Sequence, residues 1–461
     1  MLKIIKSNLI KFKNLNILEI LIILSPFIDV ITSLMVRFYE VDISLGLIVR
    51  MMFLLFMIYF LFVKSKSKYK KLSIIFVCLF MVYCISFLVI MYITKNRAVL
   101  FTELKSLVKT FYFPICLIAI FNYIDTKKEN FNFNILVCTS LIYMLLVVIP
   151  NIIGYGFSAY NGSSMGGVNG WFYAANEIGA IFAILMPIII FSYQKFNKKI
   201  IYLIIVMFSS YTMLQMGTKV PMLCVIIAIL SFIIFHTLGL IFTKDKEKTK
   251  ILLFSIGMIL IIAPILITSP AAKRLNLKIN DLLSNNSENK LTKEDYDLIV
   301  LSDRVFKKNE IKKRAQNSPL VYRVMGTGYI YMENYSKKDT IDEERMKEEV
   351  LYKVENMPEN MTEMDYHDIY YNYGIVGVIV YFSGIIIMLW YIVIKIIKNI
   401  KKYFLQEDIY ASLISIIMAI GVAYLAGHVF FAPAVSIYLA IIVANLLFIM
   451  INTMEESNDK N

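Results

Sequence analysis

Long apolar runs and short polar segments alternate along almost the whole chain. About twelve of these runs are long enough to cross a bilayer as helices, because roughly 20 apolar residues at about 1.5 Å per residue match its hydrocarbon core. We expect the spans at residues 16–36, 45–63, 72–93, 107–121, 134–153, 176–193, 199–216, 220–241, 251–269, 369–394, 409–428 and 432–452. The pattern predicts an all-α polytopic membrane protein. A hydrophobic content of 59% excludes an ordinary soluble chain.

The alternation is interrupted once, by a polar and charge-dense insert at residues 270–366. Two stretches of it, 303–317 and 341–356, have mixed charge at helical spacing, with turn signals at Ser318-Pro319 and Gly326-Thr327-Gly328 between them. We expect a large, mainly helical loop between the ninth and tenth spans, and we expect the chemistry there. The chain then has three parts: a membrane domain at 1–269, the catalytic loop at 270–366, and a second membrane domain with its tail at 367–461.

Basic residues indicate the orientation of the spans. Lysines lie before the first span and in every second loop, and positively charged loops stay on the cytoplasmic side. Both termini are then cytoplasmic, and the insert is external. The net charge of +13 is explained by this pattern, so we expect the lipid bilayer as a partner and no nucleic acid.

The cysteines and histidines give no sign of a metal site. All five cysteines lie within predicted spans and none in the insert, so neither a disulfide framework nor a zinc site is predicted. His367 and His428 are both expected on the external side, but two histidines so far apart in sequence do not define a site for a metal ion.

Charged residues fall inside several predicted spans, where each costs about 2.5–3.5 kcal/mol on insertion scales. Asp29 and Arg50 each lie roughly 8–10 Å below the external surface, so they can form a salt bridge. The pair either fixes the first helical hairpin or supports a substrate. Lys219 follows a Gly-Thr break between two uncharged spans, and its ammonium is a candidate phosphate ligand. More charges crowd the external ends of the spans, namely Glu103, Lys105, Lys109 and Glu177.

Four ionisable residues cluster where the insert meets the tenth span. Glu363 and His367 are spaced i, i+4, and Asp365 and Asp368 are spaced i, i+3, so a helix would bring them together as acid or base groups. Part of the cluster has another explanation, because Thr362-Glu-Met-Asp365 fits a capping box at a helix start. Capping does not account for all four ionisable residues, so all four are candidate catalytic residues.

Five features follow one another along residues 170–380. They are Asn176-Glu-Ile-Gly179, Gly217-Thr-Lys219, the long insert, Leu301-Ser-Asp-Arg304 with Met325-Gly-Thr-Gly-Tyr329, and Glu363-Met-Asp-Tyr-His-Asp368 followed by Tyr373-Gly-Ile-Val-Gly377. Their order and topology resemble the O-antigen ligase and O-antigen polymerase superfamily of bacterial envelope glycosyltransferases. The family usually has Ser-Arg where this chain has Thr218-Lys219. Many members carry His-Asn farther from the Gly-x-x-Gly pair, and by that spacing Glu363 is the nearer counterpart, so the identity of the base stays open.

The resemblance implies a metal-independent glycosyltransferase, without a cofactor, in the bacterial cytoplasmic (inner) membrane. It would transfer glycan from an undecaprenyl-diphosphate-linked donor to a hydroxyl of a glycan acceptor on the external face. Lys219 and Arg304, with Arg323, would bind the departing diphosphate, since positive charge at a developing anion is a large catalytic term. One residue of the cluster at 363–368 would deprotonate the acceptor hydroxyl.

Three functions remain open at this point. We expect a polysaccharide polymerase of the O-antigen or capsule type, active in exopolysaccharide biosynthesis, with a chain-length regulator as a candidate partner. Transfer of a finished glycan to a lipid or wall acceptor, as by an O-antigen ligase, uses the same chemistry. A lipid-linked oligosaccharide flippase belongs to another class and would place substrate charges near the bilayer midplane, whereas the charges here gather at the outer boundary.

Overall fold

The computed structural model describes residues 15–39, 44–94, 99–159, 166–243, 246–285, 292–302, 304–330, 361–398 and 406–458. These residues are almost entirely helical, because in apolar surroundings a helix satisfies the backbone N–H and C=O groups within one segment. A short antiparallel hairpin joins β1 (Phe157–Ser158) to β2 (Val168–Gly170). The all-α membrane fold predicted from the sequence is confirmed. The helix predicted at 341–356 lies outside the described residues.

Ten of the described helices are long and apolar enough to cross a membrane, by length and composition. They are α2 (Ile17–Tyr39), α3 (Leu45–Tyr59) with its π-helical extension η2 (Phe60–Lys64), α4 (Lys70–Thr94), α5 (Leu100–Lys127), α6 (Phe133–Ile152), α9 (Lys219–Thr243), α10 (Lys246–Thr268), α16 (Asp365–Lys398), α18 (Glu407–Leu425) and α19 (Pro433–Asn458). Two shorter apolar helices are α7 (Ala175–Ile190) and α8 (Lys199–Gln215), and a 3₁₀ turn, η4 (Tyr193–Lys195), lies between them. Every predicted span coincides with one of these helices.

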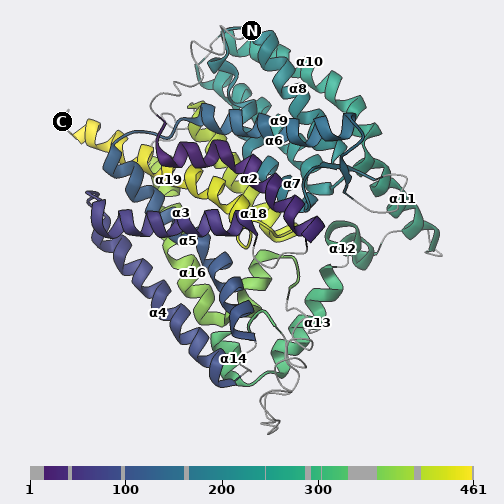
Figure 1. Ribbon diagram of the computed structural model, residues 1–461. Coiled ribbons are helices and arrows are strands. Elements are labelled where there is room, and N and C mark those ends of the chain that lie inside the picture. The colour runs from purple at the N-terminus through teal and green to yellow at the C-terminus, as the bar shows by residue number, and fades with distance from the viewer. Residues whose placement is uncertain are drawn as a thin grey trace.

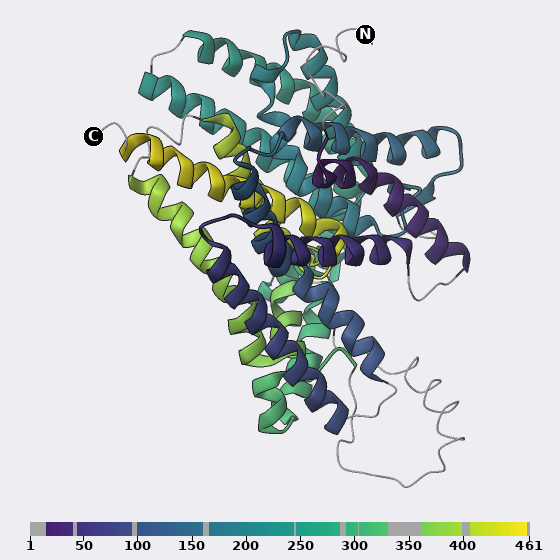
Figure 2. The same cartoon turned by 60° about the vertical axis from the view of Figure 1, so that its left-hand side comes forward.

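The most buried helices lie at the centre of the bundle. α5 packs against α19, and α7 packs against α18, α9 and α19 (Figure 1). The helices α8, α9 and α10 form one flank of the bundle, and α4 with α16 lies on the opposite side (Figure 2). The described part of the insert contributes four helices: α11 (Pro270–Asn285), α12 (Lys293–Leu301), α13 (Arg304–Asn317) and α14 (Leu320–Met325). The third of them confirms the helix predicted at 303–317.

The helix α16 is broken at Gly374, whose φ of 64° and ψ of −174° are not helical. The carbonyl groups of residues 371–373 therefore need donors from outside the helix. Two consecutive N–H groups of the turn at 326–328 donate to the first two of these carbonyls, both at 3.0 Å. The hydroxyl of Tyr83 in α4 donates to the third at 2.7 Å. The break is thus closed by the insert and by a neighbouring helix.

The turn at 326–328 is also fixed to the core of the bundle. Glu103 of α5 is fully buried, and its carboxylate accepts the N–H groups of Tyr329 at 2.8 Å and Ile330 at 3.1 Å. A side chain has no room at Gly326, because its Cβ would overlap the backbone of Asn372. The turn therefore anchors the insert on α5 and α16.

Replacement of Gly374 by alanine is expected to destabilise the protein by about 1–3 kcal/mol, because a φ of 64° strains alanine and its Cβ would overlap the carbonyl of Val324. The measurement is the unfolding temperature of the purified protein in detergent. Gly421→Ala in α18 is the matched control, since nothing lies within 4 Å of a Cβ added there, and it should be neutral or slightly stabilising. Equal unfolding temperatures for the two variants would contradict this account of the break.

Candidate functional site

A cavity of about 620 Å³ opens where the first turns of α7 and α9 and the last turn of α18 meet the insert helices α11, α12 and α13. Its wall combines apolar side chains such as Val220, Leu223 and Leu275 with polar ones. Four basic residues and one carboxylate line it, namely Lys219, Lys278, Arg304, Lys307 and Glu363. We call it the basic cavity. A site with this excess of positive charge suits an anionic ligand.

Lys219 enters the basic cavity from the start of α9. The preceding residue pair turns the chain, with Gly217 at a φ of 71°. The ammonium donates to the carbonyl of Ile299 and, at 2.9 Å, to the hydroxyl of Ser302. Lys278 of α11 donates to the carbonyl of Leu298 at 2.7 Å. Both lysines therefore tie the end of α12 to the cavity wall.

Arg304 and Lys307 hold Glu363 from one face of α13. Arg304 Nη2 lies 3.0 Å from one carboxylate oxygen, and Lys307 Nζ lies 2.8 Å from the other. Burial alone would raise the pKa of Glu363, but the hydrogen bond from Lys307 and the two positive charges outweigh burial and hold that pKa below its usual value. At neutral pH the three side chains form an ionised cluster at the edge of the basic cavity.

The backbone places Glu363 with little freedom. Its φ is 59°, in the left-handed region that residues other than glycine rarely adopt. It packs against Gly427 in the turn between α18 and α19, where an added Cβ would come within 2.7 Å of the Glu363 carbonyl oxygen. The turn at 426–432 therefore fixes the position of this carboxylate.

Asp365 lies two residues after Glu363, in a different environment. It is buried, and its carboxylate accepts three consecutive backbone N–H groups at 2.7–2.9 Å, from His428, Val429 and Phe430. It does not line the basic cavity. Through these hydrogen bonds Asp365 connects the start of α16 to the turn at 426–432.

Asp368 is buried as well, and its carboxylate accepts the N–H and hydroxyl of Thr362 at 2.6 and 2.7 Å and the N–H of Met364 at 3.2 Å. The capping box predicted between Thr362 and Asp365 is wrong, because α16 begins at Asp365 and Thr362 pairs with Asp368 instead. His367 is half-buried beside Tyr371, and its Nε2 has no hydrogen-bond partner among the described residues. Neither Asp368 nor His367 lines the basic cavity.

Arg323 is separated from the other predicted diphosphate ligands. Its guanidinium donates to the carbonyls of Gln316 and Ser318 and so holds the turn between α13 and α14. It does not line the basic cavity. Of the predicted catalytic and diphosphate-binding residues, the structure brings together Lys219, Arg304 and Glu363 in the basic cavity.

Two lysines of the basic cavity, Lys278 and Lys307, were not predicted from the sequence. Lys307 follows Arg304 by three residues, which is the spacing of neighbours on one helical face, so the periodicity of 303–317 contained the signal. Lys278 has no comparable signal, because the insert contains many lysines and only packing selects this one. Among the described residues, no group of three or more His, Cys, Asp or Glu side chains could hold a metal ion.

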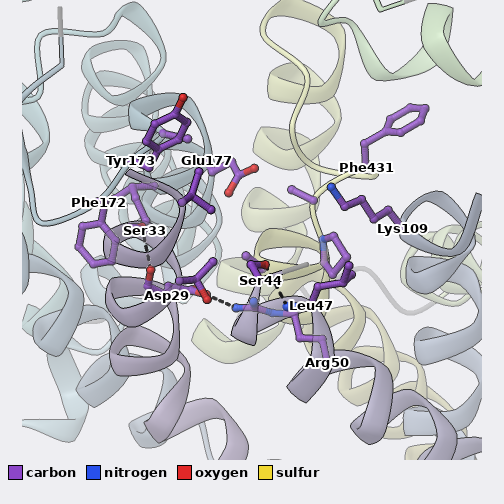
Figure 3. A pocket seen from close by; sticks show the side chains of 17 residues that line it. Asp29, Ser33, Ser44, Leu47, Arg50, Lys109, Phe172, Tyr173, Glu177 and Phe431 are labelled. Carbon is purple, nitrogen blue, oxygen red and sulfur yellow. Dashed lines mark hydrogen bonds and ion pairs between the residues drawn. The ribbon is translucent and has the colours of Figure 1, made fainter. Parts of the chain in front are cut away.

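Asp29 and Arg50 form the predicted salt bridge between α2 and α3, and both are buried. The hydroxyl of Tyr143 in α6 donates to the other oxygen of the Asp29 carboxylate. The pair also lines a second cavity, of about 210 Å³ (Figure 3). The predicted link between the first two spans is thus present, and a role of the pair in supporting a substrate stays a prediction.

Comparison with known proteins extends the resemblance beyond residues 170–380. The family model described as "O-antigen ligase like membrane protein" matches residues 11–454, nearly the whole chain. No curated protein and no solved structure matches the chain. The match includes the bundle, the insert and both cavities. The chain therefore belongs to the O-antigen ligase like family of membrane proteins, whose activity is glycan transfer.

Proposed function

We propose that the protein is a polysaccharide polymerase, which joins a glycan carried on undecaprenyl diphosphate to a hydroxyl of a second glycan. The observation that carries this proposal is the basic cavity, in which four cations face one carboxylate. The cations suit a diphosphate leaving group, and the carboxylate suits the proton of an acceptor hydroxyl. In this scheme the cations neutralise the leaving group without a metal ion, and no cofactor takes part.

The donor would lie with its diphosphate among the cations. Arg304 presents a planar fork of donors that matches phosphate oxygens, and Lys307 and Lys219 add point charges beside it. The apolar side chains of Val220, Leu223 and Leu275 form the remaining wall, where the first isoprene units of the lipid would pack. The charged residues come from the start of α9, from the insert helices α11 and α13 and from the segment before α16, as expected for a reaction at a membrane surface.

The transfer step breaks one bond and forms one. The acceptor hydroxyl oxygen attacks the anomeric carbon of the donor sugar while the bond from that carbon to the diphosphate oxygen breaks. The hydroxyl proton passes to Glu363, and the electron pair of the broken bond stays on the diphosphate, where Arg304 and the lysines stabilise it. The products are a lengthened glycan and undecaprenyl diphosphate.

The pairing of Glu363 explains how the base would be controlled. With two cations on its carboxylate it is a weak base, because its pKa is held low. A bound diphosphate offers Arg304 and Lys307 stronger anionic partners, so they would turn toward the ligand and release the carboxylate. The proton affinity of the Glu363 carboxylate then rises only when the glycan donor is bound.

The lysine pattern supports an external insert and cytoplasmic termini. Membership of the O-antigen ligase like family supports a place in the bacterial cytoplasmic membrane. The basic cavity, formed with insert helices, would then face the external side, where lipid-linked glycan is available. An O-antigen-ligase-type transfer would use the same cavity and differ in its acceptor. Product analysis separates the two, because a polymerase yields a ladder of lengths and a ligase one transferred glycan.

Arg304→Ala is expected to lower polymer formation about 10²–10³-fold, because it removes a donor at the developing negative charge. The assay is a gel of glycan lengths after purified protein is given undecaprenyl-diphosphate-linked repeat units in liposomes. Arg314→Ala is the matched control, since Arg314 lies on the same helix, pairs with Glu310 and does not line the basic cavity. A wild-type protein that neither forms polymer nor releases undecaprenyl diphosphate from an authentic donor would overturn the proposed function.

Glu363→Gln should lower turnover about 10²–10⁴-fold, because glutamine cannot accept the proton. The same change should strengthen the binding of undecaprenyl diphosphate, since Arg304 and Lys307 lose the carboxylate that competes with the ligand. Turnover and the Kd of undecaprenyl diphosphate are measured on the same preparation. Weaker diphosphate binding at unchanged turnover would mean that Glu363 only holds the insert in place.

The low pKa of Glu363 also sets a pH dependence of stability. A carboxyl whose pKa is lowered in the folded protein stabilises it above the unfolded value of about 4.3, and the contribution is lost as the pH falls through the folded value. The unfolding temperature of the wild type should therefore exceed that of Glu363→Gln by a constant amount from about pH 6 to 8, and the difference should shrink below about pH 4. A difference that vanished between pH 6 and 7 would show a raised pKa instead.

A further inference from the structure

The second cavity lies between α2, α3, α5, α7 and the start of α19. Figure 3 shows Glu177 and Lys109 pointing toward one another from opposite sides of it, with the ion pair of Asp29 and Arg50 below them in this view. The side chains of Tyr173 and two phenylalanines complete the wall. We call it the sugar cavity.

The charges of the two cavities differ. The basic cavity has four cations against one carboxylate, whereas the sugar cavity has two of each sign. A balanced set of charges does not favour an anion, but carboxylate acceptors and ammonium or guanidinium donors suit a ligand rich in hydroxyl groups, because each hydroxyl both donates and accepts. Aromatic side chains add apolar faces against which the C–H face of a sugar ring packs.

The size of the sugar cavity supports the same ligand. Its volume of about 210 Å³ is far above the roughly 10–15 Å³ that one water needs, and it lies below the roughly 300–1,000 Å³ of sites that enclose a whole drug-sized ligand. One sugar unit of a longer glycan fits this range. The buried ion pair at its base is already satisfied by Tyr143, so the wall is preformed.

The two cavities share their dividing elements. The consecutive residues Asn176 and Glu177 in the first turn of α7 line the basic cavity and the sugar cavity respectively. The turn between α18 and α19 does the same, with Ala426 on the basic cavity and Phe431 on the sugar cavity. This turn also contacts Glu363 through Gly427. The two cavities are therefore neighbours, separated by the first turn of α7 and by a turn that contacts the main chain of Glu363.

We propose that the sugar cavity binds a sugar unit of the acceptor glycan and directs the next hydroxyl toward Glu363; this inference rests on the proposed function. In this proposal the ion pair of Asp29 and Arg50 forms a rigid part of the cavity wall, and Glu177 and Tyr173 contact the sugar unit directly. Tyr173 is 60% exposed, so its replacement leaves the core intact.

The test measures the apparent KM for the acceptor and the Kd for undecaprenyl diphosphate separately, in the variants Glu177→Gln and Tyr173→Ala. Undecaprenyl-diphosphate-linked repeat unit is the donor, and a soluble oligosaccharide of the same repeat is the acceptor. The apparent KM for the oligosaccharide should rise about tenfold or more for each variant, as loss of a hydrogen bond to a charged group or of an aromatic face predicts. The Kd for undecaprenyl diphosphate should not change. Tyr155→Ala is the control, because Tyr155 is 75% exposed on the same loop and lines neither cavity.

A second readout does not require turnover. Trp171 lies two residues from Tyr173, so its fluorescence in a Trp390→Phe background reports binding of the oligosaccharide. Binding that Glu177→Gln weakens supports the inference. Unchanged binding and unchanged KM in both variants, or an effect on donor Kd alone, would overturn it while the polymerase proposal stands. Binding without any transfer by the wild type would overturn the polymerase proposal and with it the acceptor role.

Discussion

A helix that is interrupted inside an apolar bundle must have its exposed carbonyl groups paired, and this requirement connects the insert to the membrane helices. The break at Gly374 leaves the carbonyls of 371–373 without helical donors, and the turn at 326–328 and Tyr83 supply them. Buried Glu103 binds the next two N–H groups of the same segment. An insert held this way presents α13 to the ends of the membrane helices as a fixed surface.

Carboxylates near the insert divide into two kinds by what they bind. Glu103, Asp365 and Asp368 are buried and accept backbone N–H groups, as buried polar groups must. Glu363 is partly exposed and binds two cationic side chains, which can move to other partners. Backbone N–H groups cannot move away to other partners, so Glu103, Asp365 and Asp368 hold segments of the main chain in place. Glu363 is the one of the four that a ligand can release.

The fold was predictable because its signals are local. Each span needs only a run of apolar residues, and a salt bridge between Asp29 and Arg50 follows from equal depth in adjacent spans. The candidate site was predictable in part, because Lys219, Arg304 and Glu363 line one cavity. Which of Glu363, Asp365, His367 and Asp368 lines that cavity was not predictable, because it depends on the turn at 426–432. This turn lies about sixty residues away in sequence and binds Asp365. Helical spacing within 363–368 carries no information about that partner.

The ion cluster around Glu363 also bears on what else could occupy the basic cavity. A membrane surface is crowded with phosphodiester headgroups, each with a single negative charge, and an open cluster of cations would collect them. Here an incoming anion must replace a carboxylate of equal charge that is already tethered at close range, so a single phosphate gains little by exchange. A diphosphate carries more charge on adjacent groups and can engage Arg304 and Lys307 together. Within this cluster the internal carboxylate thus favours a ligand with adjacent negative charges over a single phosphodiester headgroup.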